Sequence, residues 1–293
     1  MKEIRLKARA KINISLDVIR KREDGYHDLS MIMQTVNLYD KVNLKKTTHD
    51  GIVLKTNLSF LPVDERNLVY KVIAYMRNTY GIKEGIFADL FKVIPIAAGL
   101  AGGSADAAAA IKGMDSLFEL HLTLEEMIDI GKKFGADIPY CLVEGTVLAQ
   151  GIGDQMTLLK DFPECYIVIA KPNINVSTAV AFGGLKLGQV TEAERPNNGL
   201  LIEAIGRGDL LYIGQNMRNV LETVTAKEYP MIQSIKETLL EHGALGAMMS
   251  GSGSAVFGIF QQKEEAIQAS TYLKRHDIVK FAYTTTIYNR RRD

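Results

Sequence analysis

The sequence of 293 residues is poor in cysteine, in excess charge of either sign and in long apolar segments. Its two cysteines, Cys141 and Cys165, lie among apolar residues and are too few for a disulfide framework or a cysteine metal cluster. We therefore expect buried, reduced thiols in a cytoplasmic protein. Because 35 Lys and Arg residues balance 34 Asp and Glu residues, the net charge of +1 argues against a protein that coats nucleic acid or anionic lipid.

Membrane insertion and secretion are not expected either. No apolar run approaches the ~20 residues that a membrane-spanning helix needs. The segment Met1–Leu6 alternates charged and apolar residues, which is not the pattern of a signal peptide. A composition of 47% hydrophobic and 24% charged residues is instead typical of a soluble globular protein.

The length predicts about two domains at ~150 residues each, or one large domain, and we place two domains at residues 1–156 and 157–293. Strand and helix patterns mix without a strict βαβ rhythm, which favours the α+β class. Alternation or apolar runs predict strands over 4–19, 30–38, 41–47, 52–56, 86–94, 165–170, 255–260 and 278–287. Helical patterns cover 68–80, 104–118, 123–135, 177–183, 199–224, the segment after Pro230, and 263–275.

Two helix starts carry capping signals. Asn67 is placed to cap the helix that Gly81 ends. Thr123 and Glu126 have the spacing of a capping box, and Gly135 is placed to end that helix. The glycine-spotted stretch 145–153 receives no assignment.

The strongest local feature is the small-residue loop Pro95–Ser104, which leads into an alanine-rich helix. Glycines let backbone N–H groups turn inward, and the N-terminus of a helix favours a phosphate. A glycine-rich turn before a buried helix accounts for the same residues without any ligand. A Walker A loop is excluded because no Lys follows the glycines, and Gly99, Gly102 and Gly103 have the wrong spacing for a dinucleotide fingerprint.

A second glycine cluster, Ser250–Ser254, precedes the apolar strand that begins at Ala255. Such turns are common before strands, so the cluster alone says little. Two glycine-rich loops in one chain fit two walls of a phosphate site better than either does alone.

Lys11 and Asn13 interrupt an apolar strand and, by alternation, lie on one side of it, facing away from the core. They form either a polar wall or a solvated strand face. Asp137, next to Pro139, is either the N-cap of a helix or a carboxylate that accepts a proton from a hydroxyl. Asp24–His27 is either a hairpin loop or an aromatic and a histidine that bind a base.

Taken in chain order, five segments resemble the GHMP-type small-molecule kinases over nearly the whole chain: Ala10–Asn13, Asp24–His27, Pro95–Ser104, Gly135–Pro139 and Ser250–Phe257. The resemblance implies a two-domain GHMP kinase fold with the active site in the cleft between the domains. The Asp24–His27 and Gly135–Pro139 segments are similar to the member that phosphorylates the 2-hydroxyl of a cytidine diphosphate alcohol in the non-mevalonate isoprenoid pathway, with ATP as donor.

The resemblance also implies roles for individual residues. Asp137 matches the catalytic aspartate that takes the hydroxyl proton, and Lys11 matches the lysine beside it that stabilises the charged groups. The residues implied in ATP binding are Pro95, Ile96, Ala97, Ala98, Gly99, Leu100, Ala101, Gly102, Gly103, Ser104, Asn67 and Lys92. Those implied in binding the cytidyl substrate are Asn13, Tyr26, His27, Phe182 and Asp137, with Tyr26 and Phe182 around the cytosine and His27 at its edge.

The resemblance implies Mg²⁺ bound mainly through the ATP phosphates, without a dedicated protein metal site. Partners are expected to be the small-molecule substrate and ATP, not nucleic acid or membrane, and the chain a monomer or weak homodimer. Ala97, Ala101 and Ala105 stand where the family often has glycine or serine, so those positions are not expected to need a conformation open only to glycine. Two alternatives stay open: another GHMP kinase acting on homoserine, mevalonate or a sugar, and a non-catalytic homologue that senses a metabolite.

Overall fold

The computed structural model describes residues 2–290, and its internal contacts divide the chain into two compact units. The first unit comprises Met1–Ala10, Leu38–Ile96 and Ala101–Val143, and the second comprises Lys11–Asn37, Ala97–Leu100 and Glu144–Asp293. Two long strands, β1 (Glu3–Lys21) and β2 (His27–Thr47), contribute residues to both units. Each unit is therefore discontinuous in sequence, and a domain boundary after residue 156 stays a prediction.

In the first unit, β4 (Gly85–Phe91) pairs with two neighbours. It runs parallel to β3 (Ile52–Thr56) and antiparallel to residues 41–47 of β2. Side chains alternate between the two faces of these strands, as a period of two requires. The fully buried set includes Val42, Leu44, Ile86, Ala88 and Leu90.

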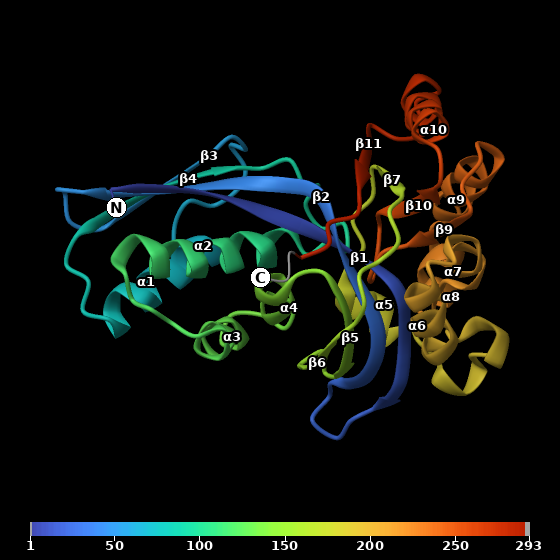
Figure 1. Cartoon of the computed structure of the whole chain (residues 1–293), viewed down its shortest axis with the longest axis horizontal. Helices are drawn as coiled ribbons and strands as arrows, with labels where there is room; N and C mark the ends of the chain where they lie inside the picture. The colour runs from blue at the N-terminus through green and yellow to red at the C-terminus, as the bar shows by residue number, and fades with distance from the viewer. Residues whose placement is uncertain (1, 291–293) are drawn as a thin grey trace. The chain divides into compact units, whose positions relative to one another are not determined.

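Four helices complete the first unit and lie below the strands β2 and β4 in Figure 1. They are α1 (Leu68–Thr79), α2 (Gly102–Phe118), α3 (Leu124–Lys132) and α4 (Ile138–Val143). Helix α2 packs against the other three. The alanines Ala107–Ala110 are buried, and Leu6 and Leu44 lie against Gly113, so small residues let α2 pack closely on its neighbours.

Both predicted helix starts in this unit are confirmed. The Asn67 side chain accepts a hydrogen bond from the Val69 N–H at 2.9 Å and caps α1. At α3, Thr123 accepts from the Glu126 N–H at 3.2 Å while the Glu126 carboxylate accepts from the Thr123 N–H at 2.8 Å. These bonds satisfy N–H groups that have no partner within a helix. The hydrogen bonds that the Glu126 carboxylate accepts from Thr123 also lower the pKa of Glu126.

The second unit contains two sets of paired strands. Strand β5 (Thr146–Gly151) runs antiparallel to residues 29–34 of β2 and to β6 (Gln155–Leu158). The short strand β8 (Arg218–Asn219) pairs in parallel with β1 at Ser15 and Leu16. A separate antiparallel sheet has the order β11 (Phe281–Thr286), β7 (Tyr166–Lys171), β10 (Val256–Phe260), β9 (Gly246–Met249).

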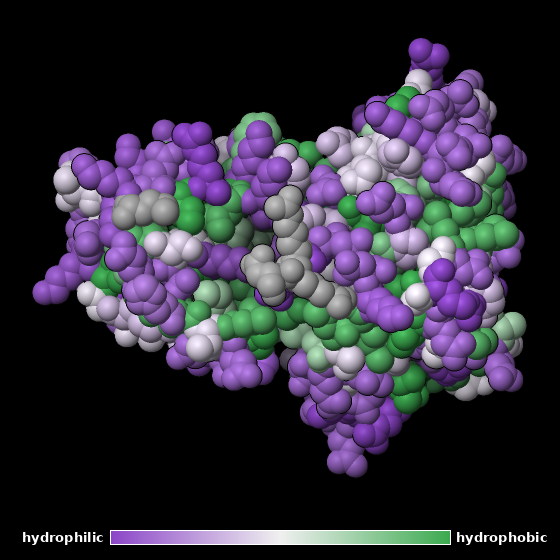
Figure 2. Space-filling model, viewed as in Figure 1, coloured by the Kyte–Doolittle hydropathy of each residue, from purple (hydrophilic) through white to green (hydrophobic). Residues whose placement is uncertain are grey.

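Helices cover this second sheet. Helix α9 (Met231–Glu241) packs against β9 and β10, and α10 (Lys263–Arg275) packs against β7 and β11 (Figure 1). The remaining helical segments are α5 (Thr178–Gly183), η1 (Leu187–Gln189), η2 (Glu192–Glu194), α6 (Asn198–Arg207), α7 (Leu210–Asn216) and α8 (Glu222–Glu228). In Figure 2 the surface over α10 and over the tip of the β1–β2 hairpin is hydrophilic, in keeping with the ion pairs that Arg20 and Arg22 form with Asp28.

The α+β class is confirmed, and several bounds match, since β3 and α10 cover the expected residues. Two expectations are wrong in detail. The strands expected at 30–38 and 41–47 are one continuous strand β2, and β8 lies among the helical segments expected at 199–224. The stretch 145–153, for which no element was expected, contains β5. No helix in the described part of the chain is long and apolar enough to cross a membrane.

The capping box of α3 makes a direct prediction. Replacing Thr123 with Ala removes the side-chain acceptor, and we expect the free energy of unfolding to fall by about 1 kcal/mol. Urea unfolding followed by circular dichroism measures the change. The control is Thr79→Ala, at the exposed end of α1, which leaves the unfolding midpoint unchanged; equal losses in the two variants would contradict the capping role.

Candidate active site

Lys11 and Asn13 lie side by side in the second unit. The Lys11 Nζ donates a hydrogen bond to the Asn13 Oδ1 at 2.7 Å, which confirms that the two side chains share one side of β1. The expectation that this side faces away from the core is wrong, because Lys11 is 5% and Asn13 0% exposed. Strand β1 is covered on both sides here, since Ile12 and Ile14 are buried too. A buried ammonium whose partner is a neutral amide keeps its positive charge available for an anion.

The two glycine-rich loops are in direct contact within the second unit. Ser250 donates from its Oγ to the Gly99 carbonyl at 2.9 Å, and the Ala255 N–H donates to the Ala98 carbonyl at 3.1 Å. A Cβ on Gly99 would lie 2.0 Å from the Ser250 carbonyl oxygen, so a side chain is excluded by contact, and the φ of +73° at Gly99 also disfavours one. The loops that the sequence suggested as two walls of one site thus pack backbone against backbone.

Lys11 contacts both glycine-rich loops. Its backbone N–H donates to the Leu100 carbonyl at 3.1 Å, and its Nζ lies 3.5 Å from the position that a Cβ on Gly251 would take. A positive charge therefore sits where the two loops meet. Together these groups suit the binding of a phosphate.

The other residues of the Pro95–Ser104 loop belong to the first unit, and the last of them begin α2. Ala101 occupies the N-cap position with φ 55° and makes no capping hydrogen bond with a side chain. The first N–H groups of α2, at Gly102–Ser104, therefore have no side-chain cap and remain suited to an anion. Although Ala97 and Ala101 are not glycine, both adopt the left-handed region, with φ 51° and 55°. The alanines therefore tolerate a conformation that glycine would adopt more easily.

Lys92 lies in a buried ionic cluster of the first unit. Its Nζ donates to the Asp106 Oδ2 at 2.5 Å and also to the Asp40 carboxylate. The three residues are at most 7% exposed. The sequence motifs did not indicate Asp40 or Asp106; the single acid within the alanine run 105–110 was the one available signal for Asp106. The adenosine contact of Lys92 stays a prediction.

The residues expected around a base gather in the second unit. The rings of His27 and Phe182 are 5.1 Å apart between centroids and tilted by 35°, whereas the Tyr26 side chain is 61% exposed. Burial lowers the pKa of His27, with a smaller effect of Lys21, so its imidazole is neutral at neutral pH. A neutral imidazole can both donate and accept a hydrogen bond, as recognition of a base edge requires.

Helix α5, which carries Phe182, is fixed to the second glycine loop. The hydroxyls of Thr178 and Ser252 are 3.0 Å apart, and the Ser254 Oγ donates to the Ile174 carbonyl at 2.8 Å. The Ser250–Ser254 loop therefore contacts both the Pro95–Ser104 loop and the segment that carries Phe182.

Asp137 lies in the first unit at the start of α4. Its carbonyl accepts from the Cys141 N–H at 3.1 Å, but its carboxylate forms no hydrogen bond or ion pair within residues 2–290. The side chain is partly exposed. It therefore holds the N-cap position without capping the helix, which leaves the carboxylate available to a substrate. Asn67, in contrast, uses both ends of its amide, since it also donates to the Pro62 carbonyl at 2.9 Å.

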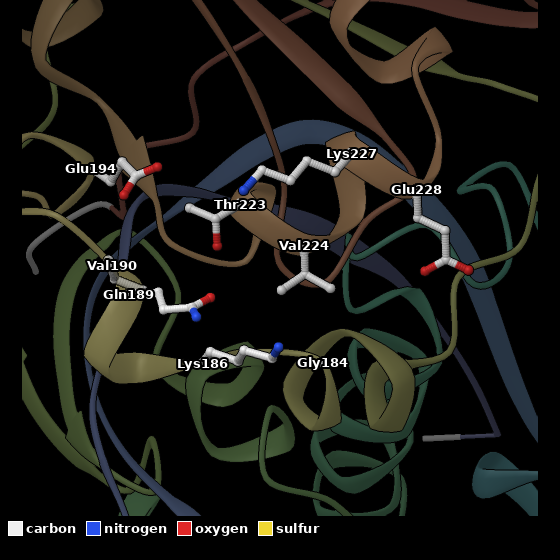
Figure 3. Close-up of a pocket in the computed structure, with 9 residues that line it drawn as sticks. All are labelled: Gly184, Lys186, Gln189, Val190, Glu194, Thr223, Val224, Lys227 and Glu228. Carbon is white, nitrogen blue, oxygen red and sulfur yellow. The ribbon is translucent and has the colours of Figure 1, made fainter.

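A cavity of about 450 Å³ in the second unit is lined by residues that follow α5 and by residues of α8 (Figure 3). Its lining residues are Gly184, Lys186, Gln189, Val190, Glu194, Thr223, Val224, Lys227 and Glu228. None of the residues expected to bind substrate or ATP lines it. Its two lysines and two glutamates balance in charge, which gives no preference for an anion or a cation.

Comparison with known proteins identifies the family. Residues 67–145 match the GHMP kinases N terminal domain, and residues 201–278 match the GHMP kinases C terminal domain. A 4-diphosphocytidyl-2-C-methyl-D-erythritol kinase of Lachnospira eligens is 50% identical over 98% of this chain and 99% of its own length. The chain belongs to the 4-diphosphocytidyl-2-C-methyl-D-erythritol kinases of the GHMP kinase family. A second member, from Caldicellulosiruptor saccharolyticus, is 46% identical over 97% of both chains.

A solved structure agrees with this assignment to the 4-diphosphocytidyl-2-C-methyl-D-erythritol kinases. The crystal structure of a 4-(cytidine 5'-diphospho)-2C-methyl-D-erythritol kinase superposes with a TM-score of 0.84 at 26% identity and covers 98% of this chain and 100% of its own. The resemblance that the sequence motifs indicated is therefore confirmed, together with the GHMP kinase fold. The roles of the individual site residues stay predictions.

The contact between the glycine loops of this kinase can be tested. Gly99→Ala introduces a Cβ against the Ser250 carbonyl, and we expect a loss of about 1–3 kcal/mol in the free energy of unfolding because the loops must separate. Urea unfolding provides the measurement. In the control Gly103→Ala, the new Cβ meets nothing closer than the Leu68 Cδ1 at 3.7 Å, so a loss as large as that of Gly99→Ala would argue against the loop contact.

Proposed function

We propose that this chain transfers the γ-phosphate of ATP to the 2-hydroxyl of 4-diphosphocytidyl-2-C-methyl-D-erythritol in the cytoplasm, as a monomer or weak homodimer. The observation that carries the proposal is the arrangement within the second unit. Lys11 lies at the contact of two glycine loops, and one of these loops also holds the helix that carries Phe182 against His27. A cation at a phosphate site and an aromatic site linked by one loop suit a substrate that carries both a diphosphate and a base.

The proposed mechanism rests on charge and position. Phosphoryl transfer has a loose transition state, so an enzyme accelerates it mainly by positioning the groups and stabilising their charge. Lys11 stabilises the charge on the phosphates, and Asp137 accepts the proton of the 2-hydroxyl as its oxygen attacks the γ-phosphorus. The bond from this phosphorus to the bridging oxygen of ATP breaks, and ADP leaves. The absence of any bond to the Asp137 carboxylate within residues 2–290 supports the role of an acceptor.

Magnesium fits this proposal as an ion carried by ATP. Among the described residues, no three His, Cys, Asp or Glu side chains form a metal site. Phosphate oxygens and water are suitable ligands for Mg²⁺. When bound, the ion neutralises part of the phosphate charge.

Asp137→Asn tests the proton acceptor. The amide has the shape of the carboxylate but does not accept a proton, so we expect kcat to fall by about 10²–10⁴-fold while KM for both substrates changes little. Steady-state kinetics with ATP, Mg²⁺ and the cytidyl alcohol measures both constants. Asp129→Asn, on the exposed surface of α3, keeps the wild-type kcat. Near-normal turnover of Asp137→Asn would remove the assignment.

Substitutions of the aromatic residues test recognition of the base. Tyr26→Ala and Phe182→Ala should each raise KM for the cytidyl alcohol, because stacking on a base contributes about 1–3 kcal/mol, and leave KM for ATP unchanged. Tyr26→Phe keeps the ring and should behave like wild type. An unchanged KM in both alanine variants would contradict the cytosine site, and faster turnover of homoserine or mevalonate would favour another GHMP kinase activity.

A further inference from the structure

The buried cluster of Asp40, Lys92 and Asp106 contains two acids and one base. Asp106 is 3% exposed and Asp40 0% exposed, so the carboxylates have little contact with water. Two carboxylates that share one buried ammonium do not both ionise easily, because like charges repel strongly away from water. The cluster therefore favours a state with one added proton, in which its net charge is zero.

The hydrogen bonds place this proton on Asp106. Asp40 already accepts from the Lys92 ammonium and from the N–H groups of Val93 and Ile94. The Asp106 Oδ2 accepts from Lys92, while its Oδ1 is buried without a partner. Burial, followed by the charge of Asp40 and a hydrogen bond with it, raises the pKa of Asp106 well above its usual range, although Lys92 opposes the shift. A proton on Asp106 provides the donor for that bond to Asp40.

The cluster lies directly behind the first turn of α2. Asp106 is four residues after Gly102, so the two residues lie on the same face of the helix. A Cβ on Gly102 would lie 3.4 Å from the Lys92 Nζ and 3.0 Å from the Ile94 Cγ2. The first N–H groups of α2 and the ionic cluster are thus immediate neighbours, with glycine leaving room for Lys92.

We propose that Asp106 is a positioning residue for the nucleotide and that the first turn of α2 binds the phosphates of ATP with Asp106 protonated, so that ATP binding takes up one proton at any pH at which this carboxyl is ionised in the free protein. The inference rests on the proposed function for its ligand. An ionised Asp106 places a negative charge beside the same N–H groups that bind the phosphates and weakens the positive end of the helix. The proton comes from solvent and forms an O–H bond on the Asp106 carboxyl, and it returns to solvent when ATP leaves.

Asp106 has few charged neighbours, so few other groups could cause a pH dependence of ATP binding at this place. Lys92 follows β4, and Asp40 belongs to β2. Helices α1, α3 and α4 also pack against α2, but within the described residues none of them forms an ion pair with Asp106. A titration that Asp106 causes is therefore expected to disappear when this single carboxyl is replaced.

The test compares Asp106→Asn with wild type in the full chain. Asn has the shape of the protonated acid and donates a hydrogen bond to Asp40, but it does not ionise. The dissociation constant of MgATP is measured by calorimetry from about pH 6 to about pH 10. The titration of ATP and of the other ionisable groups is the same in both measurements, so it cancels in the ratio of the two constants. We expect the ratio of the wild-type constant to the variant constant to rise with pH, by up to about tenfold per pH unit.

The control is Asp89→Asn, which changes an exposed residue of β4. The ratio of the wild-type dissociation constant to that of this variant is expected to stay constant with pH. A constant ratio for Asp106→Asn overturns the inference. If that variant does not fold, infrared difference spectra of wild type at high pH decide: ATP binding should produce the C=O band of a protonated carboxyl, and its absence overturns the inference.

Normal turnover of the cytidyl alcohol with a constant ratio would overturn the inference and leave the proposed function intact. A rising ratio without turnover of that alcohol would overturn the proposed function and support the inference on ATP.

Discussion

The backbone contact between Gly99 and Ser250 is the constraint on which the site in the second unit depends. Because the backbone of Gly99 lies directly against the Ser250 carbonyl, a side chain at position 99 would push the two loops apart. The Leu100 carbonyl, next in the chain, accepts from Lys11, while Ser252 and Ser254 hold the segment before Phe182. The first loop thus holds the cation and the second holds the segment before the aromatic residue, and the contact between the loops links the two positions.

Two buried lysines show how surroundings give one residue type different roles. Lys11 has an amide oxygen as its partner, so within the described residues its positive charge is not cancelled by a carboxylate. Lys92 lies between two carboxylates, and burial opposes its charge less than they favour it, so its pKa is raised. Lys11 is therefore suited to attract an anion, whereas Lys92 compensates the charge of two acids beside the first turn of α2.

Local patterns predicted much of this molecule because much of it is set locally. The caps at Asn67 and Thr123 and the turn at Asp24 and Gly25 depend on residues a few positions apart. Strand β5 was missed because it is short and flanked by glycines, and its pairing partner in β2 lies more than 100 residues earlier in the chain. Asp40 and Lys92 are 52 positions apart, so no local pattern indicates that they meet. The burial of Lys11 likewise could not be predicted, because the alternation along β1 does not indicate that both of its sides are covered by other parts of the fold.

The division of β1 and β2 between the two units affects how the chain can be cut. Residues 11–37 supply the partners of β8 and β5, which lie more than 100 residues later. A fragment that starts at Glu144 would expose the unpaired edges of both strands, and such edges promote aggregation. Truncation at a single point therefore yields neither unit intact. A circular permutant, which keeps every residue and moves only the termini, is the rearrangement that respects this architecture.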